Sequence, residues 1–216
     1  MAYASDPELL VLTALRLKSF APAEVVAMVA DLPADQAEPI LQSLLERELV
    51  KYREGVLTGW LLTPLGRAEG EKRLAAELAE TGTKPAVESA YAQFLPLNAD
   101  VLHICTDWQL LGGESSQTLN DHSNADYDAS VIARLAELDD KLRPVLVELS
   151  DALERFATYE SRLSEALSRV QAGRAGGDDW ADWFTKPTID SYHTVWFELH
   201  ENLLATLGIE RASEGS

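Results

Sequence analysis

The sequence predicts a mainly α-helical protein with one small β-hairpin in its N-terminal part. Apolar residues recur every three or four positions between residues 9 and 49, which is the period of amphipathic helices. The segments 50–53 and 57–62 read as two short strands around a Glu54-Gly55 turn. From residue 84 onward the apolar positions again follow helical spacing, and no segment alternates like a strand.

The start of each of the first three helices is predicted from capping residues and prolines close to it in the sequence. Ser5-Asp6-Pro7 combines a capping side chain with a proline near the first helical position, and this helix is expected to end near Lys18-Ser19. Pro22 begins a second, shorter helix. After the turn at 31–33, Ala34 or Asp35 is expected to cap a third helix, which extends to about residue 48.

The hairpin and the step that follows it complete the N-terminal pattern. Thr63-Pro64 is expected to begin a fourth helix directly after the second strand. The order helix, helix, helix, strand, strand, helix is that of a winged helix-turn-helix. The segments LQSLLERELVKY at 41–52 and WLLTPLGR at 60–67 resemble the MarR and PadR regulator families.

This resemblance covers about the first 80 residues. In those families the first segment is the recognition helix that enters the first wing strand, and the second is the return strand that enters a linker helix. The resemblance implies that the helix at 35–48 lies in a DNA major groove, where polar side chains contact base edges. The residues expected to contact DNA on this helix and its wing are Gln36, Gln42, Ser43, Arg47, Lys51 and Arg53.

The charge of the chain opposes simple DNA binding. The whole chain has a net charge of −18, and residues 1–83 contain 8 basic and 13 acidic residues. DNA-binding domains are usually basic because they neutralise phosphates and release counterions. On the third helix, Asp35, Glu38 and Glu46 would face phosphates unfavourably. The alternative is therefore a winged helix that serves as a protein-interaction module without DNA binding.

The second half of the chain, after a boundary at 81–85, is predicted to be a helical bundle. The expected domains are 1–83, the winged helix, and 84–216, a helical region for dimerisation and possible effector binding. Its seams have heptad-like spacing, which favours a homodimer. Pro96 is expected to interrupt or kink the first helix, and Pro144 to begin a new one. Asn98 either fixes the register of a helical interface or caps a helix that restarts after Pro96.

Three segments of this half carry most of its His, Trp and Asn residues. The segments 95–111, 120–132 and 180–203 resemble the C-terminal half of a group of uncharacterised winged-helix proteins of actinobacterial type, and that resemblance implies no activity. A small-molecule effector pocket is one interpretation, and a hydrophobic core with hydrogen-bonded histidines is the other. The residues proposed for effector binding are His103, Asp107, Trp108, Trp183, His193, Trp196 and His200.

Enzymatic and metal chemistry are not expected. His103 and Asp107 are one helical turn apart, but no fixed metal-binding motif is present, and a metal-dependent enzyme is the least favoured alternative. No nucleophile with a matching base is found, so no catalytic residue, metal or cofactor is predicted. Cys105 lies on an apolar stripe, as an inert buried thiol would.

The expected location is the cytoplasm. The chain has one cysteine, no apolar run of the ~20 residues that span a bilayer, and no secretory signal pattern at its N-terminus. The sequence thus favours a cytoplasmic, homodimeric, DNA-binding transcriptional regulator. Its expected partners are double-stranded DNA, a second copy of itself and a small-molecule effector, and no membrane partner is expected.

Overall fold

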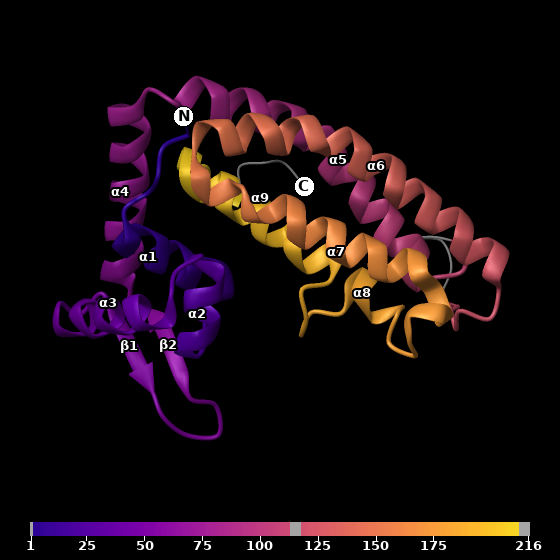
Figure 1. Cartoon of the computed structure of the whole chain (residues 1–216), viewed down its shortest axis with the longest axis horizontal. Coiled ribbons are helices and arrows are strands. Elements are labelled where there is room, and N and C mark those ends of the chain that lie inside the picture. Colours follow the sequence, from indigo (N-terminus) through magenta and orange to yellow (C-terminus); the bar gives the residue numbers. More distant parts are fainter. Residues whose placement is uncertain (1, 113–117, 212–216) are drawn as a thin grey trace. The chain divides into compact units, whose positions relative to one another are not determined.

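A computed structural model describes residues 2–112 and 118–211. This part of the chain is mainly helical, with one two-stranded antiparallel sheet (Figure 1). It separates into two compact units. We call residues 2–87, 150–155 and 200–211 the N-terminal unit, and residues 88–112, 118–149 and 156–199 the helical unit. Each unit is described by itself.

The N-terminal unit has the predicted order of elements. Asp6 caps the first helix by accepting hydrogen bonds from the backbone N–H groups of Glu8 and Leu9. The third helix begins after Pro33 and has no side-chain cap, so the expected cap at Ala34 or Asp35 was wrong. The elements are α1 (Pro7–Lys18), α2 (Ala23–Val29), α3 (Ala34–Glu46), β1 (Val50–Arg53), β2 (Gly59–Leu62) and α4 (Pro64–Thr81).

The hairpin has a longer loop than the sequence predicted. The strands pair from Val50↔Leu62 to Arg53↔Gly59, so residues 54–58 form the loop and Leu57 lies outside β2. The start of β2 is set by packing, because a Cβ on Gly59 would lie 2.7 Å from the carbonyl oxygen of Ala21. Only glycine permits this close approach to the segment before α2.

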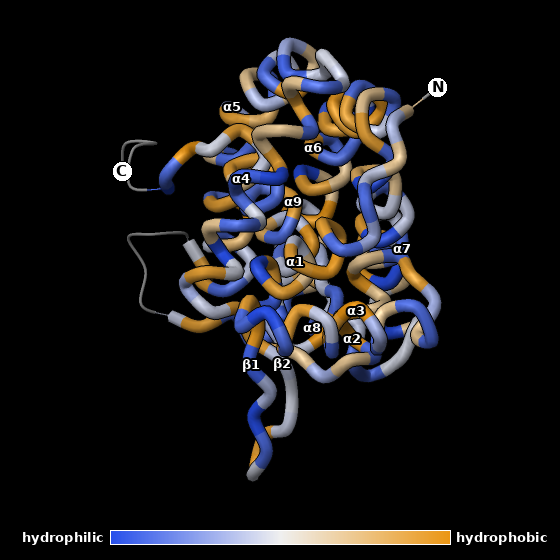
Figure 2. The backbone as a smooth tube through the Cα atoms, turned by 90° about the vertical axis from the view of Figure 1, so that its left-hand side faces the viewer, coloured by the Kyte–Doolittle hydropathy of each residue, from blue (hydrophilic) through white to orange (hydrophobic). Residues whose placement is uncertain are grey.

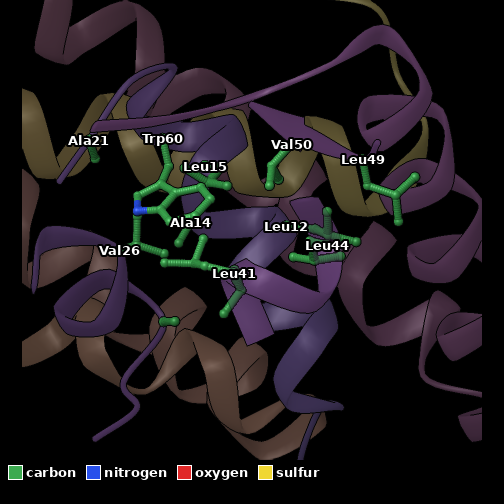
Figure 3. Close-up of a cluster of buried hydrophobic side chains, with 12 residues drawn as sticks. Leu12, Ala14, Leu15, Ala21, Val26, Leu41, Leu44, Leu49, Val50 and Trp60 are labelled. Atoms are coloured by element: carbon green, nitrogen blue, oxygen red, sulfur yellow. The ribbon is translucent and has the colours of Figure 1, made fainter. Parts of the chain in front are cut away.

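The core of the N-terminal unit joins the first three helices to the hairpin. Trp60 of β2 is 3% exposed, and it lies beside Leu15 of α1 and Val26 of α2 (Figure 3). Burial of such side chains stabilises the unit by about 1.5–3 kcal/mol each. The other buried members of this cluster are Val11, Leu12, Ala14, Ala21, Ala30, Leu41, Leu44, Leu49 and Val50.

Two later segments complete the N-terminal unit. Arg155 is buried and forms an ion pair with Glu77 of α4. It also donates hydrogen bonds to Ser5 Oγ, at 2.8 Å, and to Thr206 Oγ1 of α9 (Tyr192–Leu207), at 3.1 Å. The contacts therefore group residues 150–155 and 200–211 with the first 87 residues. The functional domains 1–83 and 84–216 stay a prediction.

The helical unit contains longer helices than the sequence predicted. The elements are α5 (Lys84–Gln109), α6 (Ala125–Ala152), α7 (Thr158–Ala172), α8 (Asp182–Thr185) and the first half of α9. Pro96 lies inside α5 and Pro144 inside α6, so the expected helix start at Pro144 was wrong, and of the two expectations for Pro96 an interruption is excluded. A proline removes a single intrahelical hydrogen bond, and the buried faces on both sides keep the helix continuous.

The start of α9 lies later than Thr188, a capping type of side chain that follows α8 in the sequence. The helix begins instead at Tyr192, and Ser191 Oγ accepts a hydrogen bond from the backbone N–H of Thr194 at 3.3 Å. Hydrophobic and hydrophilic residues alternate along the helices, as amphipathic packing requires (Figure 2). No helix in the described ranges is long and apolar enough to span a bilayer, and location in the cytoplasm stays a prediction.

Candidate functional site

The six residues predicted to contact DNA lie on neighbouring elements of the N-terminal unit. All six side chains are exposed. Gln36, Gln42 and Ser43 project from α3, and Arg47 is its C-terminal cap. Strand β1 carries Lys51 and Arg53, which we call the wing cations after the predicted wing. The structure therefore brings these six residues to the α3–hairpin region, and their contact with DNA stays a prediction.

The arginines around α3 are held in ion pairs. Arg47 lies 2.7 Å from Glu8 of α1, and Arg73 of α4 lies 2.6 Å from the same carboxylate. Arg16 lies 2.6 Å from Glu71 of α4. Within residues 2–112 and 118–211, Lys51 and Arg53 have no ion-pair partner. The free cationic charge of this region is thus concentrated on β1.

Acidic side chains interrupt the exposed face of α3. Asp35, Glu38 and Glu46 are exposed. Gln42, one of the predicted base-reading residues, donates a hydrogen bond to Glu38 Oε1 at 3.0 Å. Because Gln42 would have to break this hydrogen bond before it contacts a base edge, the net gain in free energy from that contact is smaller.

A groove of about 490 Å³ lies between α2, α3 and the hairpin. This is within the usual size range of binding pockets. We call it the α3–hairpin groove. Its lining includes Glu24 of α2, Glu38, Gln42 and Leu45 of α3, and Tyr52 and Trp60 of the hairpin.

Two aromatic side chains, Tyr52 and Trp60, line the floor of the groove. Tyr52 and Trp60 are paired across the two strands, and their ring centroids are 4.8 Å apart. Trp60 is fixed by the core, whereas Tyr52 is 44% exposed and Leu45 is 36% exposed. Side chains alternate along a strand, so Tyr52 faces the opposite side of the hairpin from its neighbours Lys51 and Arg53. The groove is therefore separated from the wing cations.

Sequence reasoning missed this groove. Three segments that are distant in the chain form it, and only the strand alternation at Tyr52 signalled an exposed aromatic residue. The hairpin loop adds Val56, which is fully exposed, and Leu57, which is 67% exposed. Such apolar residues at a hairpin tip suit contact with protein better than contact with phosphates.

The tryptophans proposed for effector binding lie mostly in the core of the helical unit. Trp108 is 2% exposed and stacks on Phe184, with centroids 4.3 Å apart. Trp196 is also 2% exposed and donates a hydrogen bond from Nε1 to Asn98 Oδ1 at 3.0 Å. Trp183 is partly exposed, under the guanidinium of Arg169. The buried position of Trp108 and Trp196 favours the core interpretation.

The structure favours the first of the two interpretations of Asn98. This residue lies inside the continuous helix α5 and does not cap a restarted helix. It joins α5 to α9 within one chain, through the hydrogen bond from Trp196. A partly buried polar pair of this kind helps to fix the register of the two helices.

The remaining effector candidates are dispersed. His103 is exposed on α5, and Asp107 lies 2.6 Å from Arg134 of α6. His193 is partly buried, and this burial lowers its pKa. His200 is buried in the N-terminal unit. A groove of about 230 Å³ between α5 and α6 includes His103 alone among the seven candidates, so effector binding stays a prediction.

A cluster of polar side chains, Asn120, His122 and Asp128, connects the segment before α6 to the first turn of that helix. Asp128 is 4% exposed and accepts hydrogen bonds from Asn120 Nδ2 at 2.8 Å. His122 Nδ1 lies 3.2 Å from the same carboxylate, and its ring is 4.4 Å from that of Trp108. Asn120 and His122 lie in the segment between α5 and α6, of which residues 113–117 lie outside the described residues. The cluster satisfies a buried carboxylate and holds the loop against Trp108.

The possible metal ligands and the single cysteine have the following surroundings. Across the described ranges, no three His, Cys, Asp or Glu side chains are grouped closely enough to hold a metal ion. Cys105 is buried, and burial raises its pKa to about 12. A thiol with such a pKa is a poor nucleophile at neutral pH, as expected from its position on the apolar stripe.

No protein-family model matches the chain, and neither a curated protein nor a solved structure matches it. A proposal for its function therefore starts from the ion pairs and the groove of the N-terminal unit.

Proposed function

We propose that the N-terminal unit is a winged helix-turn-helix domain that binds a protein partner. In this proposal α2 and α3 form the helix-turn-helix, the hairpin of β1 and β2 is the wing, and α4 is the helix that follows it. The order of elements and the resemblance of the segments 41–52 and 60–67 to the MarR and PadR families support the fold.

One observation carries the choice of a protein partner. The arginine nearest the exposed face of α3, Arg47, is already neutralised by Glu8, while the groove beside α3 combines apolar and acidic side chains. DNA affinity depends on cations that replace phosphate counterions. An Arg47 that must first leave Glu8 contributes less to that affinity. A protein surface, in contrast, gains from the exposed Leu45 and Tyr52.

Site-specific cross-linking in the native cells tests this function. A photoreactive amino acid at position 52 should cross-link one discrete protein, and the same group at Leu65, which is exposed on α4, should not. The cross-link should disappear when Glu24 and Glu38 are replaced by glutamine. Equal labelling from both positions, or cross-linking to DNA alone, would contradict the proposal.

DNA binding is the second candidate, because Lys51 and Arg53 are exposed on β1 without an internal counter-charge among the described residues. In this candidate, Gln36 and Ser43 read base edges and the wing cations contact phosphates. A duplex from the region upstream of the gene, titrated across a salt series, decides between the two. Salt-sensitive binding that the pair of substitutions Arg47→Gln and Arg53→Gln abolishes would support the DNA regulator.

Association of two copies and binding of an effector belong to the same regulatory candidate. A homodimer would present two helix-turn-helix units to two half-sites. A ligand in the helical unit would act only if it bound two states of the dimer unequally. Both remain proposals, as does the absence of enzymatic activity.

A further inference from the structure

The α3–hairpin groove combines an apolar surface with an acidic one. Its floor is aromatic and apolar, through Tyr52, Trp60 and Leu45. Its walls carry the carboxylates of Glu24 on α2 and Glu38 on α3, both exposed. An occupant that matches this lining must offer apolar surface and positive charge at the same time.

The carboxylates of the groove lack a cation of their own. In the part of the chain that the structure describes, neither Glu24 nor Glu38 has an ion-pair partner, and Glu38 accepts only the amide hydrogen bond of Gln42. The nearest arginine of α3, Arg47, is engaged by Glu8, and the strand alternation directs Lys51 and Arg53 to the other side of the hairpin. These two exposed acids are therefore available to a cation of another molecule.

The geometry points to a cationic and partly apolar segment of a partner protein as the occupant of the groove. An arginine or lysine of this segment pairs with Glu24 and Glu38, and its guanidinium or ammonium lies over the exposed ring of Tyr52. Neighbouring aliphatic side chains pack on Leu45 and Tyr52. This inference rests on the proposed protein-interaction function and gives it a partner chemistry.

Short synthetic peptides test the chemistry directly on the full chain labelled with ¹⁵N. One peptide alternates arginine with leucine, a second of equal length alternates glutamine with leucine, and a third alternates glutamate with leucine. The arginine peptide should shift the resonances of Gln42, Tyr52 and the Trp60 indole, and the glutamate peptide should not. The pair of substitutions Glu24→Gln and Glu38→Gln should weaken its binding about tenfold, because each exposed ion pair contributes up to ~1 kcal/mol.

A matched variant controls for the net charge of −18, which attracts any cation weakly. The substitutions Asp35→Asn and Glu46→Gln remove two charges from the same helix outside the groove, and they should change the affinity by less than about twofold. Equal weakening by both variants, or no binding of the arginine peptide, would overturn the inference. Tighter binding of the glutamine peptide in the groove would overturn it and leave protein docking intact. Shifts of the Gln42 and Tyr52 resonances on titration with duplex DNA alone, without any peptide, would overturn the protein-interaction function itself.

Discussion

At the scale of single residues, Arg155 is the clearest case of a buried charge with a structural task. It lies 150 residues from Ser5 in the chain and 78 residues from Glu77, and it bonds both. A buried ion pair contributes little relative to an apolar pair of the same volume, but removal of one partner leaves a desolvated charge. Arg155 therefore specifies where the segment 150–155 joins the N-terminal unit.

The substitution Glu77→Gln should lower the free energy of unfolding by about 3–5 kcal/mol, because it removes the counter-charge from a buried guanidinium. Urea denaturation followed by far-UV circular dichroism measures the change. The control is Glu165→Gln, which breaks the exposed pair with Arg169 and should cost less than about 1 kcal/mol. A loss no larger than that of the control would show that the buried pair is not needed.

Asp139 gives a prediction about pH. Desolvation by burial raises the pKa of this carboxyl above its ordinary value of 3.8, against the hydrogen bonds from Tyr192 and Arg143. The folded chain therefore holds the proton more tightly than the unfolded chain. It follows that stability from this group is present at low pH and is lost as the pH rises from 3.8 through the raised value.

The variant Asp139→Asn should lack this loss, because an amide oxygen still accepts the hydrogen bond from Tyr192 without carrying a charge. The stability of the wild type relative to this variant should fall as the pH rises above about 3.8, measured by urea denaturation at each pH. Asp151→Asn, at an exposed position twelve residues further along α6, should leave that dependence unchanged. A relative stability that rises with pH would mean that Arg143 stabilises the charged carboxylate more than burial disfavours it.

At the scale of elements, the step from β2 into α4 illustrates how strongly local chemistry can fix a boundary. Thr63 Oγ1 accepts a hydrogen bond from the backbone N–H of Gly66 at 3.0 Å and donates one to the carbonyl oxygen of Glu48 at 2.8 Å. A Cβ on Gly66 would lie 1.8 Å from the carbonyl oxygen of Leu49. The Thr-Pro-Leu-Gly sequence thus both caps α4 and allows it to touch the start of β1.

The substitution Thr63→Ala should destabilise the N-terminal unit by about 1–2 kcal/mol, through loss of the cap. Thr63→Ser keeps the hydroxyl and should cost clearly less. Urea midpoints of the three chains, compared at equal m-values, provide the measurement. If serine proved as costly as alanine, the methyl group of Thr63 rather than its hydroxyl would be the stabilising feature.

At the scale of the whole molecule, the open question is how many copies of the chain associate. Helix α5 exposes Leu95 and Leu102, which are seven residues apart and 39% and 53% exposed. Two such positions on one long helix have the spacing of a helix–helix seam. The homodimer predicted from the sequence has a candidate surface in this stripe.

We expect the chain to sediment as a dimer at about micromolar concentration, and the pair of substitutions Leu95→Glu and Leu102→Glu to yield folded monomers, because charges in an apolar seam are left unpaired. Sedimentation velocity with circular dichroism provides the readout. Leu65→Glu, on an exposed position of α4, should leave the dimer unchanged. A wild-type chain that sediments as a uniform monomer would refute the homodimer.

The order of the elements and most of their boundaries in the first 83 residues followed from the sequence. These boundaries depend on interactions between residues that are close in the sequence. They are the caps at Asp6 and Thr63, the prolines that follow them, and the period of the apolar residues, so they can be recognised from the sequence alone. The same local rules failed at Pro96 and Pro144. There, packing along the length of α5 and α6 outweighed the loss of one hydrogen bond in each helix.

What only the tertiary structure decided is which side chains meet. The sequence determined that Arg47 is exposed near the end of α3, but the fold alone placed it against Glu8, 39 residues earlier. The fold also joined Glu24, Glu38 and Tyr52 into one groove, and assigned His200 to the N-terminal unit. These features depend on contacts between distant segments, for which local periodicity carries no signal. The pattern of helices and strands is therefore a property of the sequence, whereas the availability of its charges for a partner is a property of the packed chain.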